Sequence, residues 1–378
     1  MNHFIVKTKI FCGDKALENI GNLKINKACI VCDKFVEDSG MLNELFALLE
    51  SLNVSYSVFS DVIPDPDYNI VAKGVAAIER SGSDAIISVG GGSVLDTGKL
   101  VGLIYGRSSE LPCPILIEIP TTAGTGSEVT SFSVITNPDD NSKFPIVDDD
   151  MLPDYAILDA RFTQSIPPSV TADTGFDVLT HALEAYVSTE ATVFSDALAE
   201  KAISLVCRNL PIAVKDGENI EARTAMLNAS CMAGIAFNHA KLGLCHGMAH
   251  AFGGQFHIAH GRANSLFLPE VISFNGGLDR DIAVSCTPIR KKYAIIASKL
   301  GFQAKNDKEL TLCLVETIKE LRKMVDLPQR VRDLGITETD YMAALDILTE
   351  QAMRDSSTIT NPVAPHMAQT KTLFINAF

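Results

Sequence analysis

Tryptophan is absent from the 378-residue sequence, and aromatic residues together make up only 7% of it. Flat rings on which nucleic-acid bases could stack are therefore scarce. Positive charge is also in short supply, since 32 lysines and arginines face 46 aspartates and glutamates, a formal net charge of −14. Binding to nucleic acid or to an anionic membrane surface needs a basic face, so the composition argues against both kinds of partner.

Long apolar runs are missing too. No stretch approaches the roughly 20 apolar residues that span a bilayer, and the opening MNHFIVKTKIF lacks the apolar core and cleavage site of a signal peptide. We therefore expect a cytoplasmic protein. The nine cysteines are odd in number and scattered, which predicts reduced thiols. Cys29 and Cys32 form a CxxC pair inside a predicted strand, so their side chains should point to opposite faces of the sheet and not form a metal or redox pair.

The length predicts two domains, and the order of segments divides the chain in the same way. Short apolar or β-branched runs at 28–33, 54–61, 84–90 and 114–120 alternate with helical stretches at 42–52 and 69–81, which predicts a parallel sheet covered by helices. Helix-period segments then follow at 171–188, 194–214, 219–240, 243–254, 261–274, 290–300, 307–325 and 338–354. With Pro167-Pro168 as the boundary, we expect an α/β domain over residues 1–166 and an all-helical domain over 167–378.

A glycine-rich turn follows the third of these predicted strands. Gly90-Gly91-Gly92-Ser93 leads into a helical segment, where backbone amides and the helix N-terminus can hold a phosphate; a plain tight turn is the alternative. Asp33 ends the first clear strand. Its carboxylate could accept hydrogen bonds from ribose hydroxyls, or it could be an exposed loop acid. The hydroxyl-rich run IPTTAGTGSEVT at 119–130 lies after another strand, at the edge where open α/β sheets bind ligands.

Histidines gather in the second half of the chain, where five of the eight fall between residues 239 and 260. Asp177 and His181 are four residues apart in a helical segment, as are His246 and His250, so each pair shares a helix face. His260 follows after a glycine-containing turn. A carboxylate with two or three imidazoles suits iron, zinc, nickel or manganese, whereas a single histidine is more often a hydrogen-bonded core residue. The spacing does not separate His246 from His250 as ligands.

The ordered motifs GGGSVLDTGK, PTTAGTGSEVT, TGFDVLTHALEAY and HGMAHAFGGQFHIAHG together resemble the iron-containing (group III) alcohol dehydrogenases. The resemblance covers nearly the whole chain. It implies a dinucleotide-binding α/β domain joined to a helical metal-binding catalytic domain, the dehydroquinate synthase-like fold. Within the family, Ile63-Pro64-Asp65-Pro66 and DVLTHALEAYVS most resemble the branch of 1-propanol dehydrogenases from propanediol-utilising microcompartments.

The resemblance also implies roles for individual residues. The metal ligands would be Asp177, His181, His246 and His260, and His250 would lie beside the nicotinamide as a proton relay. Phe237 would line the substrate pocket. The positions expected to bind the cofactor are Asp33, Asp65, Gly91, Gly92, Ser93, Asp96, Thr121, Thr122, Thr125, Thr130 and Lys143. One departure is Val363 in Thr360-Asn361-Pro362-Val363, where many relatives have arginine.

The expected function is therefore that of an NAD(H)- and Fe²⁺-dependent alcohol dehydrogenase, with Zn²⁺ as the alternative metal. Its substrates would be a short-chain aldehyde such as propanal and the primary alcohol, in fermentative regeneration of NAD. A homodimer and association with a bacterial microcompartment are expected from the resemblance. The alternatives are a zinc-dependent polyol (glycerol-type) dehydrogenase, a 1,2- or 1,3-propanediol dehydrogenase, a metal-dependent hydrolase or lyase, and a non-catalytic cargo protein.

Overall fold

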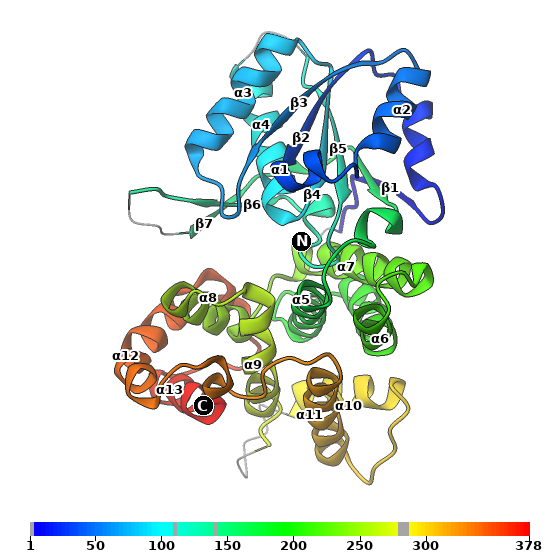
Figure 1. Ribbon diagram of the computed structural model, residues 1–378. Coiled ribbons are helices and arrows are strands. Elements are labelled where there is room, and N and C mark those ends of the chain that lie inside the picture. Colours follow the sequence, from blue (N-terminus) through cyan, green and yellow to red (C-terminus); the bar gives the residue numbers. More distant parts are fainter. Residues whose placement is uncertain (1–3, 109–111, 140–142, 279–286) are drawn as a thin grey trace. The chain divides into compact units, whose positions relative to one another are not determined.

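The computed structural model describes residues 4–108, 112–139, 143–278 and 287–378, which form two compact units, Met1–Ile166 and Pro167–Phe378 (Figure 1). The first unit is α/β and the second is helical, so the predicted fold class is confirmed. No helix within the described ranges combines the length and apolar composition needed to cross a bilayer.

The first unit is built on a six-stranded parallel sheet of order β1-β8-β5-β4-β2-β3. The strands are β1 (Lys9–Cys12), β2 (Lys27–Asp33), β3 (Ser55–Val62), β4 (Ala85–Gly90), β5 (Ile115–Pro120) and β8 (Tyr155–Leu158). The helices between them are η1 (Ala16–Asn22), α1 (Lys34–Asp38), α2 (Asn43–Ser51), α3 (Tyr68–Ser81) and α4 (Gly92–Ser108). The predicted strands and helices of this half are all present, with ends that differ by one residue.

Helices cover both faces of this sheet because successive side chains of each strand alternate between two buried clusters. On one face η1 and α2 pack over Ile30 and Ile87, and on the other α3 and α4 pack over Val31 and Ile86. Cys32 belongs to the first cluster and Cys29 to the second, which confirms that the CxxC thiols point to opposite faces. Burial raises the pKa of both thiols, that of Cys32 to about 12, so neither is a reactive thiolate at neutral pH.

The direction of chain progression reverses between β2 and β4. From β2 the chain passes through α1 and α2 to β3 on one side, whereas from β4 it passes through α4 to β5 on the other. The carboxyl ends of β2 and β4 therefore flank the topological switch point, where open α/β sheets bind ligands. Asp33 ends β2, and the glycine run follows β4 at this same edge.

The sequence pattern does not predict the hairpin of β6 (Phe132–Thr136) and β7 (Lys143–Val147), which is antiparallel. Pro145 interrupts the strand signal of β7, and the four-residue strand β8 is too short to show a period. Three short helices complete the unit: η2 (Ser127–Val129), η3 (Asp149–Met151) and η4 (Ala160–Thr163).

The second unit consists of helices, in agreement with the helix-period segments after residue 167. They are α5 (Pro168–Val187), α6 (Val193–Lys215), α7 (Ile220–Ala240), α8 (Leu244–Phe256), α9 (His260–Asn275), α10 (Thr287–Lys299), α11 (Asp307–Met324), η6 (Val331–Leu334), α12 (Glu338–Arg354), η7 (Ser356–Thr360) and α13 (Met367–Ala377). Pro168 occupies the first turn of α5, a position that needs no amide donor. From Thr171 onward α5 is buried almost throughout, packed by α6, α7 and α9.

Candidate metal centre

Four side chains from three helices of the second unit converge on one point. Asp177 and His181 lie on α5, His246 on α8 and His260 at the start of α9. One donor atom from each of the four lies within 4.8 Å of all the others. The Oδ1 atom of Asp177 lies 3.8 Å from His181 Nε2, 3.7 Å from His246 Nε2 and 3.3 Å from His260 Nε2.

These separations match those of ligands around one metal ion. Tetrahedral ligands at bond lengths of about 2.1 Å lie about 3.4 Å apart. One carboxylate and three imidazoles are also a donor set that iron and zinc both accept. The residues therefore fit a divalent metal. In the structure the amide Nδ2 of Asn264 lies at this point, 2.9 Å from Asp177 Oδ1, 3.3 Å from His246 Nε2 and 3.1 Å from His260 Nε2.

A close approach of two helices brings Asp177 and His260 together. A Cβ atom built on Gly261 would lie 1.9 Å from the carbonyl oxygen of Asp173 and 3.2 Å from the Cβ of Asp177. Any larger residue would push α9 away from α5. Asp173 also accepts two hydrogen bonds from Arg262, of 3.0 and 3.1 Å, which fixes the register of the two helices.

Burial and neighbouring charges act against each other on the ionisable groups of the cluster. Burial opposes ionisation of Asp177, yet the histidines around it hold the pKa of this carboxyl well below its ordinary value. Burial likewise opposes the charged form of His246, but Glu184 and Asp177 raise the pKa of this imidazole to about 9. In the absence of a metal, a proton on His246 therefore offsets part of the negative charge of the buried carboxylates, and a metal bound at Nε2 would displace the proton from that nitrogen.

His250 lies next to the cluster but its ring is oriented by another partner. Its Nδ1 lies 2.8 Å from Oδ2 of Asp355, and its ring centroid lies 5.0 Å from that of His260. Phe237, on α7, stacks on His181 with ring centroids 4.5 Å apart. Burial opposes ionisation of Asp355, but His250 and Ser357 lower the pKa of its carboxyl to about 2.

The residues expected to bind the cofactor fall into two groups in the first unit. The first group is partly or fully exposed and follows the carboxyl ends of β2, β3, β4 and β5: Asp33, Asp65, Gly91, Gly92, Ser93, Thr122 and Thr125. A Cβ atom on Gly92 would lie 2.6 Å from a methyl carbon of Thr125, so glycine is required there by close packing. Asp65 has a left-handed backbone, with φ of 55°. Lys143 opens β7, but its side chain lies outside the described part of the structure.

The second group, Asp96, Thr121 and Thr130, forms hydrogen bonds that stabilise the hydroxyl-rich loop at 119–130. Asp96 accepts hydrogen bonds from Ser127 Oγ at 2.5 Å and from the amide of Val134 at 2.8 Å, so protein donors engage both of its carboxylate oxygens. The buried Lys99 donates to Thr130 Oγ1 at 3.3 Å. The amide of Thr121 bonds to the carbonyl of Gly90. Asp96, Thr121 and Thr130 therefore hold the loop in place.

Sequence reasoning missed three residues at or beside the cluster. Glu184 lies 2.5 Å from His246 Nδ1, Asn264 lies among the ligand atoms, and Asp355 orients His250. Glu184 and Asn264 carried a signal, since they are three and four residues from His181 and His260 and so share their helix faces. Asp355 is 105 residues from His250, and no local pattern links the two.

Comparison with known proteins assigns the chain to a family. The profile "Iron-containing alcohol dehydrogenase" matches residues 7–160, and "Fe-containing alcohol dehydrogenase family, C-terminal" matches residues 171–378. The chain is 40% identical over 364 residues to the 1-propanol dehydrogenase PduQ of Salmonella typhimurium, covering 96% of each chain. It is 34% identical to the NADPH-dependent butanol dehydrogenase of Clostridium saccharobutylicum, covering 99% of this chain and 97% of that one.

The solved structures agree. The alcohol dehydrogenase from Oenococcus oeni superimposes over 100% of both chains with a TM-score of 0.91 and 31% identity. The resemblance in the motifs, the profile matches over both units and the shared architecture lead to one conclusion. The chain belongs to the iron-containing alcohol dehydrogenase family and is an oxidoreductase that interconverts alcohols and aldehydes.

Proposed function

We propose that this chain is an NAD(H)- and iron-dependent alcohol dehydrogenase that interconverts a short-chain aldehyde such as propanal and its primary alcohol. The convergence of one carboxylate and three imidazoles in the second unit is the observation that carries the proposal. The 40% identity to a 1-propanol dehydrogenase supports propanal as the substrate. Asp177, His181, His246 and His260 would hold the metal.

When they are bound, the metal supplies a Lewis acid that polarises a carbonyl group and the nicotinamide supplies the hydride. The chain's own contribution begins with the four ligands, which would hold the metal between helices α5, α8 and α9. Phe237 covers one side of His181 with an apolar ring, a surface suited to a short alkyl chain. The apolar ring of Phe237 on α7 thus adjoins the proposed metal site at His181 on α5.

His250 is the proposed proton carrier. Because the pKa of Asp355 is lowered to about 2, its carboxylate is the acceptor and Nδ1 of His250 is the donor in their 2.8 Å hydrogen bond. The second nitrogen, Nε2, is then the atom that can give up or accept a proton. An imidazole nitrogen in this position can act as a general acid or base.

The switch point of the first unit is the proposed site for NAD(H). The first-turn amides of α4 begin at Gly92, and a helix N-terminus attracts phosphate oxygens. Asp33 lies at the end of the adjacent strand, where its carboxylate can accept from ribose hydroxyls and would repel a 2′-phosphate. One similar protein is NADPH-dependent, so the residues at the ribose must decide the choice of cofactor.

A cytoplasmic location stays a prediction from the sequence. Two further parts of the proposal rest on similarity alone, namely a homodimeric state and association with a bacterial microcompartment, as expected from the resemblance to the propanediol-utilising branch. Size-exclusion chromatography with light scattering tests the first, and co-sedimentation with purified microcompartments tests the last.

The decisive experiment measures oxidation of NADH by propanal with anaerobically purified protein that has been metal-stripped and then reloaded. We expect stripping to abolish activity and iron to restore it. Restoration by zinc but not by iron would make this a zinc enzyme. Binding of NADH without oxidation in any metal form would refute propanal as the substrate, and absence of NADH binding would refute the cofactor site.

A pair of histidine variants provides the matched comparison. His260→Ala removes one donor and should abolish both metal binding and activity. His257→Asn removes a nearby exposed imidazole outside the four-donor set, and asparagine tolerates its left-handed backbone, with φ of 55°. This variant should keep its metal and its activity.

A further inference from the structure

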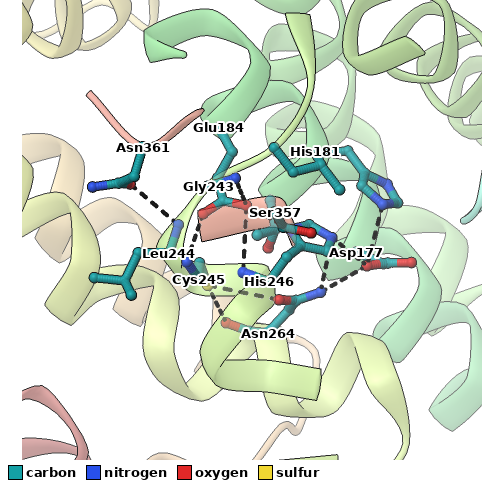
Figure 2. Close-up of polar contacts among 12 residues, drawn as sticks. Asp177, His181, Glu184, Gly243, Leu244, Cys245, His246, Asn264, Ser357 and Asn361 are labelled. Atoms are coloured by element: carbon teal, nitrogen blue, oxygen red, sulfur yellow. Dashed lines mark hydrogen bonds and ion pairs between the residues drawn. The ribbon is translucent and has the colours of Figure 1, made fainter. Parts of the chain in front are cut away.

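Glu184 is a buried carboxylate directly behind the proposed metal ligands. It lies on α5 three residues after His181 and seven after Asp177, so the three side chains share one face of the helix. Its side chain is buried, with 4% of the residue exposed. Oε2 lies 2.5 Å from Nδ1 of His246, on the side of the ring opposite to the Nε2 atom that faces Asp177 (Figure 2).

The same carboxylate closes the amino end of α8. Oε2 accepts a hydrogen bond of 3.1 Å from the amide of Gly243, and Oε1 accepts one of 2.6 Å from the amide of Cys245. The N-cap residue Gly243 has no side chain to satisfy these donors. Asn361 completes the cap by accepting from the amide of Leu244 at 3.2 Å (Figure 2). Two side chains thus cap α8, but only one of them touches His246.

We infer that Glu184 is a positioning residue that holds His246 as the Nδ1–H tautomer and thereby sets the affinity of the site for its metal. A carboxylate can only accept, so the proton of a neutral His246 must reside on Nδ1. The lone pair of Nε2 then points toward Asp177, as ligation requires. Carboxylates that accept from a ligating histidine in this way orient the ring and raise its basicity. The inference rests on the proposed function, because it requires the four donors to bind a metal.

Glu184→Gln distinguishes this role from helix capping. Glutamine has nearly the same shape and keeps one oxygen for the amides of α8. If its nitrogen replaces Oε2, it donates to Nδ1 of His246, which forces the proton onto Nε2 and blocks ligation, and it also faces the amide of Gly243 as a second donor. If it replaces Oε1, it faces the amide of Cys245 as a second donor and loses the cap. In either orientation the negative charge behind His246 is lost, and with it the added basicity of the ring, so we expect the dissociation constant for metal to rise by about 10- to 100-fold.

Asn361→Ala is the matched control, since it removes an acceptor from the same turn of α8 without touching His246. The experiment strips both variants and the wild-type chain of metal. It then measures the dissociation constant for Zn²⁺ by chelator competition, the visible spectrum of the Co²⁺ form, and the melting temperature of the metal-free protein. We expect both variants to melt at lower temperature, but only Glu184→Gln to bind Zn²⁺ more weakly and to change the Co²⁺ spectrum.

Each remaining outcome contradicts the inference in a different way. A wild-type dissociation constant in Glu184→Gln, or an equal loss of affinity in Asn361→Ala, would reduce Glu184 to a helix cap and leave the proposed function intact. Failure of the wild-type chain to bind either metal would instead overturn the proposed function, and the inference with it.

Discussion

At the scale of single residues, Glu128 shows what burial does to a carboxyl group in the first unit. It is 1% exposed, and its Oε1 has no hydrogen-bond partner in the described structure. Burial raises its pKa from 4.5 to about 7, against the opposing effects of a backbone hydrogen bond and of Lys99. The native state therefore resists ionisation of this group, whereas the unfolded chain ionises it freely above pH 4.5.

This difference predicts that Glu128 reduces stability as the pH rises. Between pH 4.5 and about 7 the unfolded state releases the proton first, so the free energy of unfolding falls and then levels off. At 1.36 kcal/mol per pKa unit the loss is about 3 kcal/mol. Glu128→Gln should remove it, so its melting temperature relative to wild type should be higher at pH 8 than at pH 5. Glu79→Gln, at an exposed carboxylate of α3, is the control, and an equal difference at both pH values would contradict the prediction.

Replacement of Asp33 should change the preference of the enzyme between NADH and NADPH. Its Oδ1 caps α1 by accepting from the amide of Val36 at 2.8 Å, and asparagine caps as well as aspartate does. Asp33→Asn should therefore keep the helix while removing the charge that repels a 2′-phosphate. We expect the ratio of kcat/KM for NADH over NADPH to fall about tenfold, or about 1.4 kcal/mol. Asp67→Asn, at the N-cap of α3, should leave the ratio unchanged. A constant ratio in both variants would mean that Asp33 does not contact the ribose.

The sequence predicted the candidate metal ligands, but it did not predict the side chains that form hydrogen bonds with them. The four-residue spacing of Asp177 and His181 predicts a shared helix face, and the structure places both on α5. The same spacing for His246 and His250 does not separate their roles, because the difference comes from Glu184 behind one ring and Asp355 beside the other. These contacts join different helices, so spacing within one helix cannot report them.

At the scale of elements, the close approach of α5 and α9 predicts a steric effect on the metal centre. Gly261→Ala would place a methyl group 1.9 Å from the backbone oxygen of Asp173, so α9 must move and take His260 with it. We expect a lower metal stoichiometry and a lower melting temperature. Gly254→Ala, in α8, has nothing within 4 Å of the added methyl group and should keep both values at or above wild type. Full metal content in Gly261→Ala, measured by elemental analysis, would contradict this reasoning.

Local patterns predicted most elements but not their pairing. The strands 27–33, 55–62, 85–90 and 115–120 carry strong β-branched runs, and helices α5 to α9 carry clear periods. The strand order, with β4 and β3 on either side of β2, depends on contacts between distant segments. The hairpin β6–β7 was missed for the same reason, since its short strands are stabilised by pairing and by bonds to Asp96.

At the scale of the whole molecule, we predict that removal of the metal and addition of NADH change hydrogen exchange in different units. The proposed metal ligands come from α5, α8 and α9, whereas the proposed nucleotide site lies at β2, β4 and α4. Because a ligand that binds only the native state stabilises it by RT ln(1 + [L]/Kd), stripping the metal should speed hydrogen exchange in α5, α8 and α9. Adding NADH should slow exchange at β2, β4 and α4. Exchange mass spectrometry checks both, and an effect of stripping that is confined to β2 and β4 would contradict the assignment.

The two faces of the sheet have a practical consequence for watching the first unit open. Cys29 and Cys32 lie three residues apart in one strand, yet each is buried under different helices. A thiol reagent can reach Cys29 only when the helices over its face, α3 and α4, move away, and Cys32 only when the helices over the opposite face, α1, α2 and η1, move away. The alkylation rates of the two sulfurs, measured by peptide mapping, therefore report local opening on each face of the sheet separately.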